Sequence, residues 1–197
     1  MSKIEFLQDT HQYLYNGVLI PSVSAIIRDD KYLGIPIDVL EKAAHRGTSV
    51  HLATEQIDTN RKVHIDPEYA PYVLQYALWK LKDNKEWTDV ETIVYTEDYA
   101  GTVDRIKRKG DKVLICDIKT TSKIYEDSLA LQLAAYILAH AKMEGLPIEN
   151  YTGAVLWLTK DRYKFKEIKP DFEGFQEKLR LYKEAHVLSD NADWAIE

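Results

Sequence analysis

A hairpin is the feature of this sequence that most restricts its fold. Residues 99–108 and 112–119 have the apolar patterning of two β-strands, and the turn Lys109-Gly110-Asp111-Lys112 joins them. The second strand contains Val113-Leu114-Ile115-Cys116-Asp117-Ile118, an almost wholly apolar run typical of strands that are covered on both faces. The chain is therefore expected to bury this strand between two layers, with an aspartate inside it.

Acidic side chains from both strands are predicted to meet. Side chains alternate along a strand, so Asp117 and Lys119 point to the same face. A four-residue loop places Asp104 directly opposite Asp117, and a two-residue loop also keeps both aspartates on one face. Only a three-residue loop or a bulge separates them. The simplest hairpins therefore favour a patch with two carboxylates and one lysine.

Such a patch suits metal-assisted cleavage of a phosphodiester. Carboxylates bind hard divalent cations, and a lysine can support the attacking water or the charge that builds on phosphorus. A charged, solvated hairpin is the alternative interpretation. Against it, Asp117 lies in an apolar strand, where a carboxylate loses hydration and needs a partner or a metal.

Further motifs accompany the hairpin in a fixed order between about residues 11 and 169. They are an opening segment from His11-Gln12-Tyr13 to Ser24, Arg46-Gly47-Thr48-Ser49-Val50-His51 with Glu55, Gly101-Thr102-Val103-Asp104, Asp117-Ile118-Lys119-Thr120, and Gln132 with Tyr136. Taken together, the chain resembles the PD-(D/E)xK nuclease superfamily. Within it, the chain is most similar to the RecB-like exonucleases and their small, free-standing viral and mitochondrial relatives. D-x-K alone is common, whereas five motifs in order are specific.

The resemblance implies a mixed α/β (α+β) fold with a restriction-endonuclease-like core. In that core a central mixed β-sheet is flanked by helices, in the order β-β-β-α-β, with N-terminal helices added. The whole chain, 1–197, is expected to be a single nuclease domain. Segment 1–85 would pack on a catalytic core at 86–170, followed by a C-terminal helix at 171–190. Within the first segment, strands are expected at 3–8 and 12–20, and Gly47 is expected to interrupt or restart the helix that Pro36 opens.

The resemblance also implies a catalytic set and a metal site. Asp104, Asp117 and Lys119 correspond to the catalytic residues of the superfamily. His51, the two aspartates and the backbone carbonyl of Ile118 would hold one or two Mg²⁺ or Mn²⁺ ions. Lys119 would position the attacking water or stabilise the developing negative charge.

Supporting roles are expected for four further side chains. Glu55 lies one helical turn after the histidine and would orient it or a metal-bound water, although such a pair is often only structural. Gln132 would steady the lysine or a phosphate, and Tyr136 would contact the DNA strand, unless it is simply a core tyrosine. Arg105 belongs to a basic cluster on the first hairpin and is expected to support the substrate. Glu91, on the preceding strand, is a weaker candidate because some relatives carry an auxiliary acid there.

Composition excludes several classes of cofactor and location. The one cysteine, Cys116, rules out the four-cysteine iron–sulfur cluster that several relatives bind. A phosphate-binding loop of the G-x-x-x-x-G-K-[ST] type is absent, so no helicase motor is expected. The start of the sequence has no signal segment, and the apolar stretch 129–139 is too short to span a bilayer. The protein is therefore expected to be cytoplasmic and without a membrane partner, and the resemblance to small viral relatives is compatible with a virus-encoded, phage-type protein.

Charge is compatible with a nucleic-acid partner despite a net value of −6. Metal-binding carboxylates contribute to the acidic count, and basic residues gather on two predicted hairpins, at 105–112 and 160–169. The expected activity is Mg²⁺- or Mn²⁺-dependent hydrolysis of DNA from single-stranded or duplex ends, in recombination, repair or replication. A structure-specific endonuclease and a catalytically inactive binding or assembly subunit remain as alternatives. A second copy of the chain or a recombination or replication protein would be compatible partners.

Overall fold

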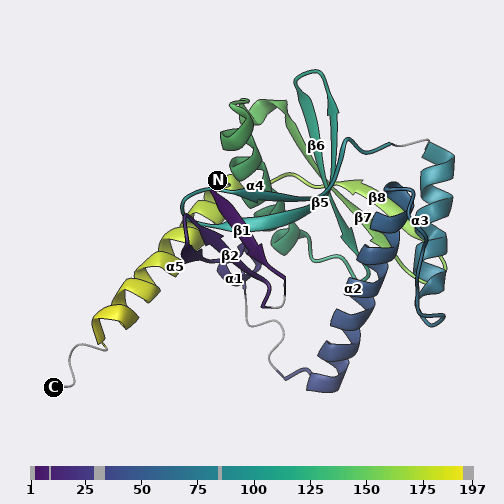
Figure 1. The fold of residues 1–197 in the computed structure, drawn as a ribbon, viewed down its shortest axis with the longest axis horizontal. Helices are drawn as coiled ribbons and strands as arrows, with labels where there is room; N and C mark the ends of the chain where they lie inside the picture. The colour runs from purple at the N-terminus through teal and green to yellow at the C-terminus, as the bar shows by residue number, and fades with distance from the viewer. Residues whose placement is uncertain (1–2, 9, 29–33, 84–85, 193–197) are drawn as a thin grey trace.

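The computed structural model describes residues 3–8, 10–28, 34–83 and 86–192, and its elements form two sheets with helices around the larger one (Figure 1). The N-terminal sheet contains β1 (Ile4–Leu7), β2 (Gln12–Tyr15) and β3 (Val18–Ile20). The remaining elements are α1 (Val23–Ile26), α2 (Ile37–Asp58), α3 (Ala70–Asp83), β4 (Asp89–Tyr95), β5 (Ala100–Lys109), β6 (Lys112–Lys119), α4 (Glu126–Glu144), η2 (Ile148–Asn150), β7 (Tyr151–Leu158), β8 (Tyr163–Glu167) and α5 (Phe172–Ala192).

The larger sheet has the topology that the sequence predicts. Its strand order is β4-β5-β6-β7-β8. Only β6 and β7 run parallel, and the other neighbours are antiparallel. Parallel neighbours need a long crossover, which α4 provides. The central order β4-β5-β6-α4-β7 is therefore β-β-β-α-β, and the mixed α/β, restriction-endonuclease-like fold is confirmed.

Helices cover the sheet on both faces, as the apolar run in β6 predicts. Val113 and Ile115 of β6 belong to the core cluster that includes α1, α4 and the buried side of α5. Cys116 and Ile118 belong to a second cluster with α2 and α3. Neighbouring residues of β6 thus face opposite layers, and the strand is buried on both sides. Asp117 lies in the middle of this buried strand and is 3% exposed.

Two local predictions differ from the structure. The strand expected over 12–20 is a hairpin, because Asn16 and Gly17 adopt positive φ angles of 52° and 83° and let Tyr15 pair with Val18. Asn-Gly is the residue pair that favours such tight hairpin turns. Helix α2 continues through Gly47 without interruption, because contacts of the helix on either side compensate for the low helix propensity of one glycine.

Among the helices described, none is both long and apolar enough to cross a bilayer.

Candidate metal-binding active site

The β5–β6 hairpin brings the two aspartates together. Arg108 lies opposite Val113 and Arg105 lies opposite Cys116, so the next position along the same register sets Asp104 opposite Asp117. Beyond Arg105 the strands separate, and the Asp104 carboxylate Oδ2 accepts the backbone N–H of Ile118 at 2.6 Å. A side-chain oxygen thus replaces the backbone carbonyl that would otherwise satisfy this buried donor.

Helix α2 and strand β4 add two more potential metal ligands. His51 Nδ1 lies 3.2 Å from Asp104 Oδ1. One ligand atom from each of His51, Glu91 and Asp104 falls within 4.8 Å of the others. An imidazole and two carboxylates at this spacing can bind a divalent cation. The sequence analysis identified Glu91 as a weaker candidate than the other site residues. In the structure Val90 lies opposite Arg105 and Thr92 lies opposite Val103, and this register sets Glu91 opposite Asp104.

Asp117 and Lys119 complete the group from the next strand. Lys119 Nζ donates to Asp117 Oδ1 at 3.0 Å and lies 2.8 Å from Oδ2. The contact between Nζ and Oδ2 has the length of an ion pair but not the geometry of a hydrogen bond. Among the described residues, no side chain or backbone group donates a hydrogen bond to the buried Oδ2. A buried carboxylate oxygen without a directed donor fits a cation as its partner.

Burial and neighbouring charges shift the pKa values of the residues in this cluster. Burial opposes the charged form of His51, but the charge and hydrogen bond of Asp104 outweigh it and raise the histidine pKa to about 9. Burial raises the pKa of Asp117 to about 6, with Lys119 opposing and Asp104 reinforcing the shift. Burial and the Asp104 charge raise the pKa of Glu91 to about 7. For Asp104, His51 and Lys119 overcome burial and lower the pKa. A bound divalent cation would favour the ionised form of these buried carboxyl groups.

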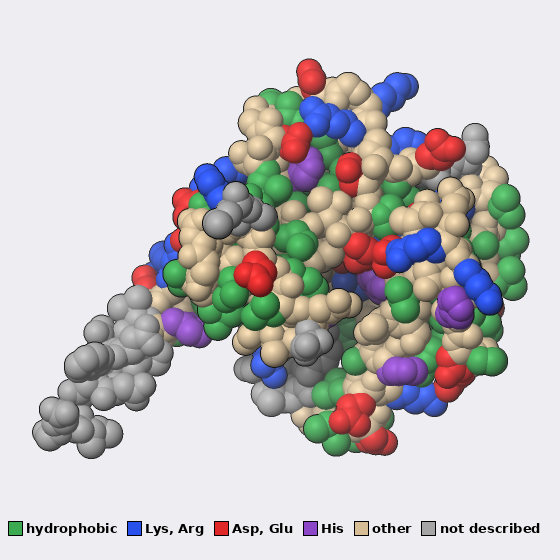
Figure 2. All heavy atoms as spheres, viewed as in Figure 1, with side chains coloured by type: hydrophobic (Ala, Val, Ile, Leu, Met, Phe, Trp, Pro, Cys, Tyr) green, Lys and Arg blue, Asp and Glu red, His purple; other side chains and the backbone are tan. Residues whose placement is uncertain are grey.

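A cleft of about 730 Å³ opens over these residues. Figure 2 shows the hollow between the N-terminal sheet and helix α2, with acidic side chains at its edge. Asp117 lies beneath the cleft surface, behind Lys119. The charged and polar lining includes His51, Glu55, Glu91, Asp104, Lys119 and Tyr136.

Gln132 and Tyr136 of α4 are joined by a hydrogen bond, and Tyr136 lines the cleft. Gln132 Nε2 donates to the Tyr136 hydroxyl at 2.9 Å. The tyrosine is 5% exposed, and burial raises its pKa well above the ordinary value. Its ring packs so closely on Gly101 that an added Cβ there would lie 2.7 Å from Cε1. The first glycine of the Gly101–Asp104 motif therefore makes room for Tyr136. Contact of Tyr136 with DNA stays a prediction.

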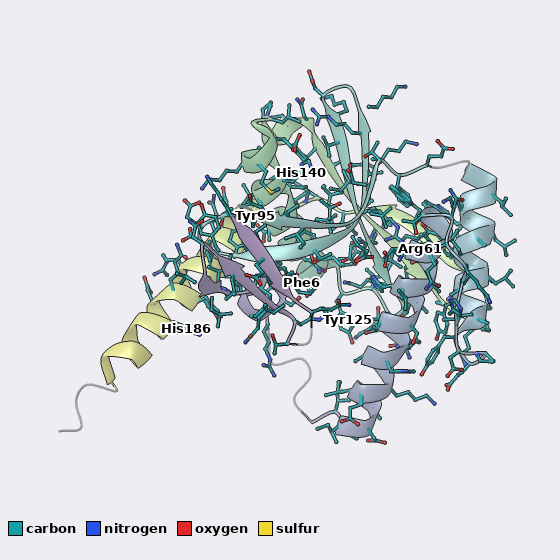
Figure 3. The ribbon with its side chains drawn as sticks, in the orientation of Figure 1. Phe6, Arg61, Tyr95, Tyr125, His140 and His186 are labelled. Carbon is teal, nitrogen blue, oxygen red and sulfur yellow. The ribbon has the colours of Figure 1, made fainter. Side chains whose placement is uncertain are left out.

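Glu55 and Arg105 have different surroundings from those expected. Glu55 lines the cleft but forms an ion pair with Arg61, which follows the end of α2 in Figure 3. Arg105 is 0% exposed, so it cannot contact a nucleic acid at the surface. This corrects its expected place in a basic DNA-binding cluster. The reason is that its position opposite Cys116 turns the side chain toward α2 and α3.

The fold and these side chains define a restriction-endonuclease-like α/β protein with a candidate site for divalent metal. The chain belongs to the PD-(D/E)XK nuclease superfamily, whose family model matches residues 64–194, two thirds of the sequence. The matched range contains Glu91, Asp104, Asp117 and Lys119, and it begins after His51.

Two solved structures show distant similarity to this chain. The crystal structure of a protein named SSO0001 is 17% identical, with a TM-score of 0.43, over 85% of this chain and 74% of the other. A phage-related exonuclease from Haemophilus somnus 129PT is 12% identical, with a TM-score of 0.38, over 82% of this chain and 89% of the other. A search of curated proteins found no significant match. Similarity at this level carries no conclusion about activity.

Proposed function

We propose that residues 1–197 act as a single nuclease domain that hydrolyses DNA phosphodiester bonds with Mg²⁺ or Mn²⁺. The observation that carries the proposal is the convergence of Asp104, Lys119 and His51 on one cleft, with Asp117 buried next to Lys119. A subunit that had lost catalysis would be expected to lack at least one of these groups.

The donor set fits a divalent cation. His51, Glu91 and Asp104 offer ligand atoms close to one another, and Asp117 contributes a buried carboxylate. Glu91 therefore joins the ligands expected from the sequence. The Ile118 carbonyl stays a predicted ligand, while the amide of the same residue holds Asp104 in place. A bound cation lowers the pKa of a coordinated water and offsets negative charge on the phosphate.

Lys119 is suited to act on the reacting water or the phosphate. Its side chain is 29% exposed and lines the cleft, while Asp117 holds the ammonium group from below. A fixed cationic donor beside the scissile phosphate stabilises the charge that develops there. Gln132 supports this arrangement indirectly, because it is hydrogen-bonded to Tyr136, which lines the same cleft.

Cleavage from DNA ends is proposed because the motif set resembles that of RecB-like exonucleases, for which recombination, repair or replication is the usual setting. The test uses end-labelled linear DNA, single-stranded and duplex, and a closed circular duplex, each with Mg²⁺, Mn²⁺ or EDTA. We expect mononucleotides or short products from linear DNA, intact circles, and no product in EDTA. Nicked or linearised circles would identify an endonuclease instead.

Control variants separate the proposed chemistry from a contaminating nuclease. Asp117→Asn should abolish product formation. Asp111→Asn changes an exposed aspartate in the turn of the same hairpin and should retain it. Equal activity of the two variants, or an inactive wild type that binds Mn²⁺ and DNA, would contradict the proposed catalysis.

A further inference from the structure

We propose that Arg105 is a positioning residue for the metal site, and that it acts through Glu91 on β4 and through Thr54 on the helical turn of His51. Its buried guanidinium holds β4 and β5 against α2, so that the ligands on these three elements face a single cation. The inference rests on the proposed function, because it concerns the metal site of the proposed nuclease.

All three nitrogens of the Arg105 guanidinium are engaged. Nε binds Asp58 Oδ2 at 2.5 Å, and Nη2 donates to Thr54 Oγ1 at 2.9 Å. Nη1 donates to Glu91 Oε1 at 3.0 Å and to the backbone carbonyl of Asp104 at 2.6 Å. A fully buried arginine is costly unless its charge and donors are paired. This fork therefore joins the three elements that carry His51, Glu91 and Asp104.

The contact with α2 reaches the turn that carries the histidine ligand. Thr54 Oγ1 accepts from Arg105 and also donates to the backbone carbonyl of His51 at 2.9 Å. Thr54 is 0% exposed, so water does not compete for these bonds. A displacement of Arg105 would consequently be transmitted to the helical turn of His51 as well as to the strands.

The contact with β4 holds a residue in an unusual conformation. Glu91 has a φ of +48°, although Val90 and Thr92 on either side keep the regular register with β5. A positive φ is uncommon for a residue other than glycine and persists where the surroundings stabilise it. The bond from Arg105 to Oε1 gives that support and directs the Glu91 side chain to the cleft.

Asp58 anchors the Arg105 guanidinium to α2. Its carboxylate is 2% exposed and binds Arg105, the Tyr76 hydroxyl at 2.5 Å and the ammonium group of Lys80. The arginine shares this carboxylate with Lys80, and its guanidinium is fixed to α2 by the contact. Lysine cannot replace this arrangement, because a single ammonium group cannot span acceptors on three elements.

The test measures Mn²⁺ binding by calorimetry, without nucleic acid, at a temperature where every variant is folded. Arg105→Lys keeps the charge and loses the fork, and we expect at least about tenfold weaker Mn²⁺ binding. Glu91→Gln should weaken binding on its own. In the double variant the total loss should be smaller than the sum of the two single losses, because part of the effect of Arg105 is transmitted through Glu91. Arg108→Lys is the matched control on the same strand, at a 41% exposed side chain, and should keep the native affinity.

Each outcome has a distinct meaning. A wild type that does not bind Mn²⁺ refutes the proposed function itself. Native affinity in Arg105→Lys, or additive losses in the double variant, overturns the positioning role and leaves the proposed function standing. If Arg105→Lys does not fold, Thr54→Val removes one acceptor of the fork, and we expect about threefold weaker Mn²⁺ binding. Unchanged affinity in folded Thr54→Val would then overturn the inference.

Discussion

Replacing Asp117 by asparagine should stabilise the metal-free protein at neutral pH while abolishing its activity. Asp117 lies in a strand covered on both faces, and its pKa is raised from 3.8 to about 6. Asparagine keeps the shape of the side chain and removes a charge that burial disfavours. The difference between 3.8 and about 6 corresponds to roughly 3 kcal/mol, since one pKa unit is about 1.4 kcal/mol. We expect a gain of unfolding free energy of that order.

The pH dependence of this gain follows from the direction of the shift. A carboxyl whose pKa is higher in the folded state than in the unfolded chain favours folding below pH 4. That contribution is lost as the pH rises through about 6. Wild type and Asp117→Asn should therefore be about equally stable near pH 4, and the variant should be the more stable protein at pH 7.5. The difference in unfolding free energy between the two proteins should grow between pH 4 and pH 7.5.

Urea unfolding in EDTA at several pH values measures the unfolding free energy of both proteins. Asp104→Asn is a useful comparison, because the opposite effect on stability is expected. The pKa of Asp104 is lowered, so its charged form stabilises the fold, and that stability is lost as the pH falls through the folded-state pKa. Asp104→Asn should also lose activity, yet be less stable than wild type at pH 7.5. Repulsion between two neighbouring carboxylates, taken alone, would predict that both variants are more stable than wild type. The ion pair with His51 reverses the sign for Asp104. A pH-independent effect of Asp117→Asn, or a loss of stability at pH 7.5, would refute the reasoning.

Three further results are expected. Lys119→Ala should keep Mn²⁺ binding by calorimetry within about threefold while turnover falls by orders of magnitude; loss of binding with native turnover at high metal would reverse the assignment. Because the metal-free pKa of His51 is about 9, Mn²⁺ affinity should rise with pH up to that range, and His51→Ala should need more Mn²⁺ and lose much of this dependence. Gly101→Ala should cost about 1–3 kcal/mol in urea unfolding, because the new Cβ would meet the Tyr136 ring. Gly47→Ala, with nothing within 4 Å, should instead gain up to about 1 kcal/mol; equal effects would contradict the close packing at Gly101.

The sequence by itself determined the central sheet and the meeting of the two aspartates. Side-chain alternation and a short turn leave few registers for a hairpin, and the one observed places Arg108 opposite Val113. The apolar run around Asp117 predicted that helices cover both faces of β6, because such a strand cannot face water. Strand alternation, turn length and apolar runs involve residues that are close in the chain, so they can be recognised in the sequence.

Tertiary structure decided the surroundings of Glu91, Arg105 and His51. The sequence pattern around Arg105 is that of a basic hairpin, and nothing local indicates that Asp58, 47 positions earlier, accepts its guanidinium. The pairing depends on how α2 packs across the sheet, which couples residues that are distant in the chain. The same packing sets Asp104 beside His51, and with it the protonation of both groups. Burial and long-range contacts set these energies, and they exist only once the layers are assembled.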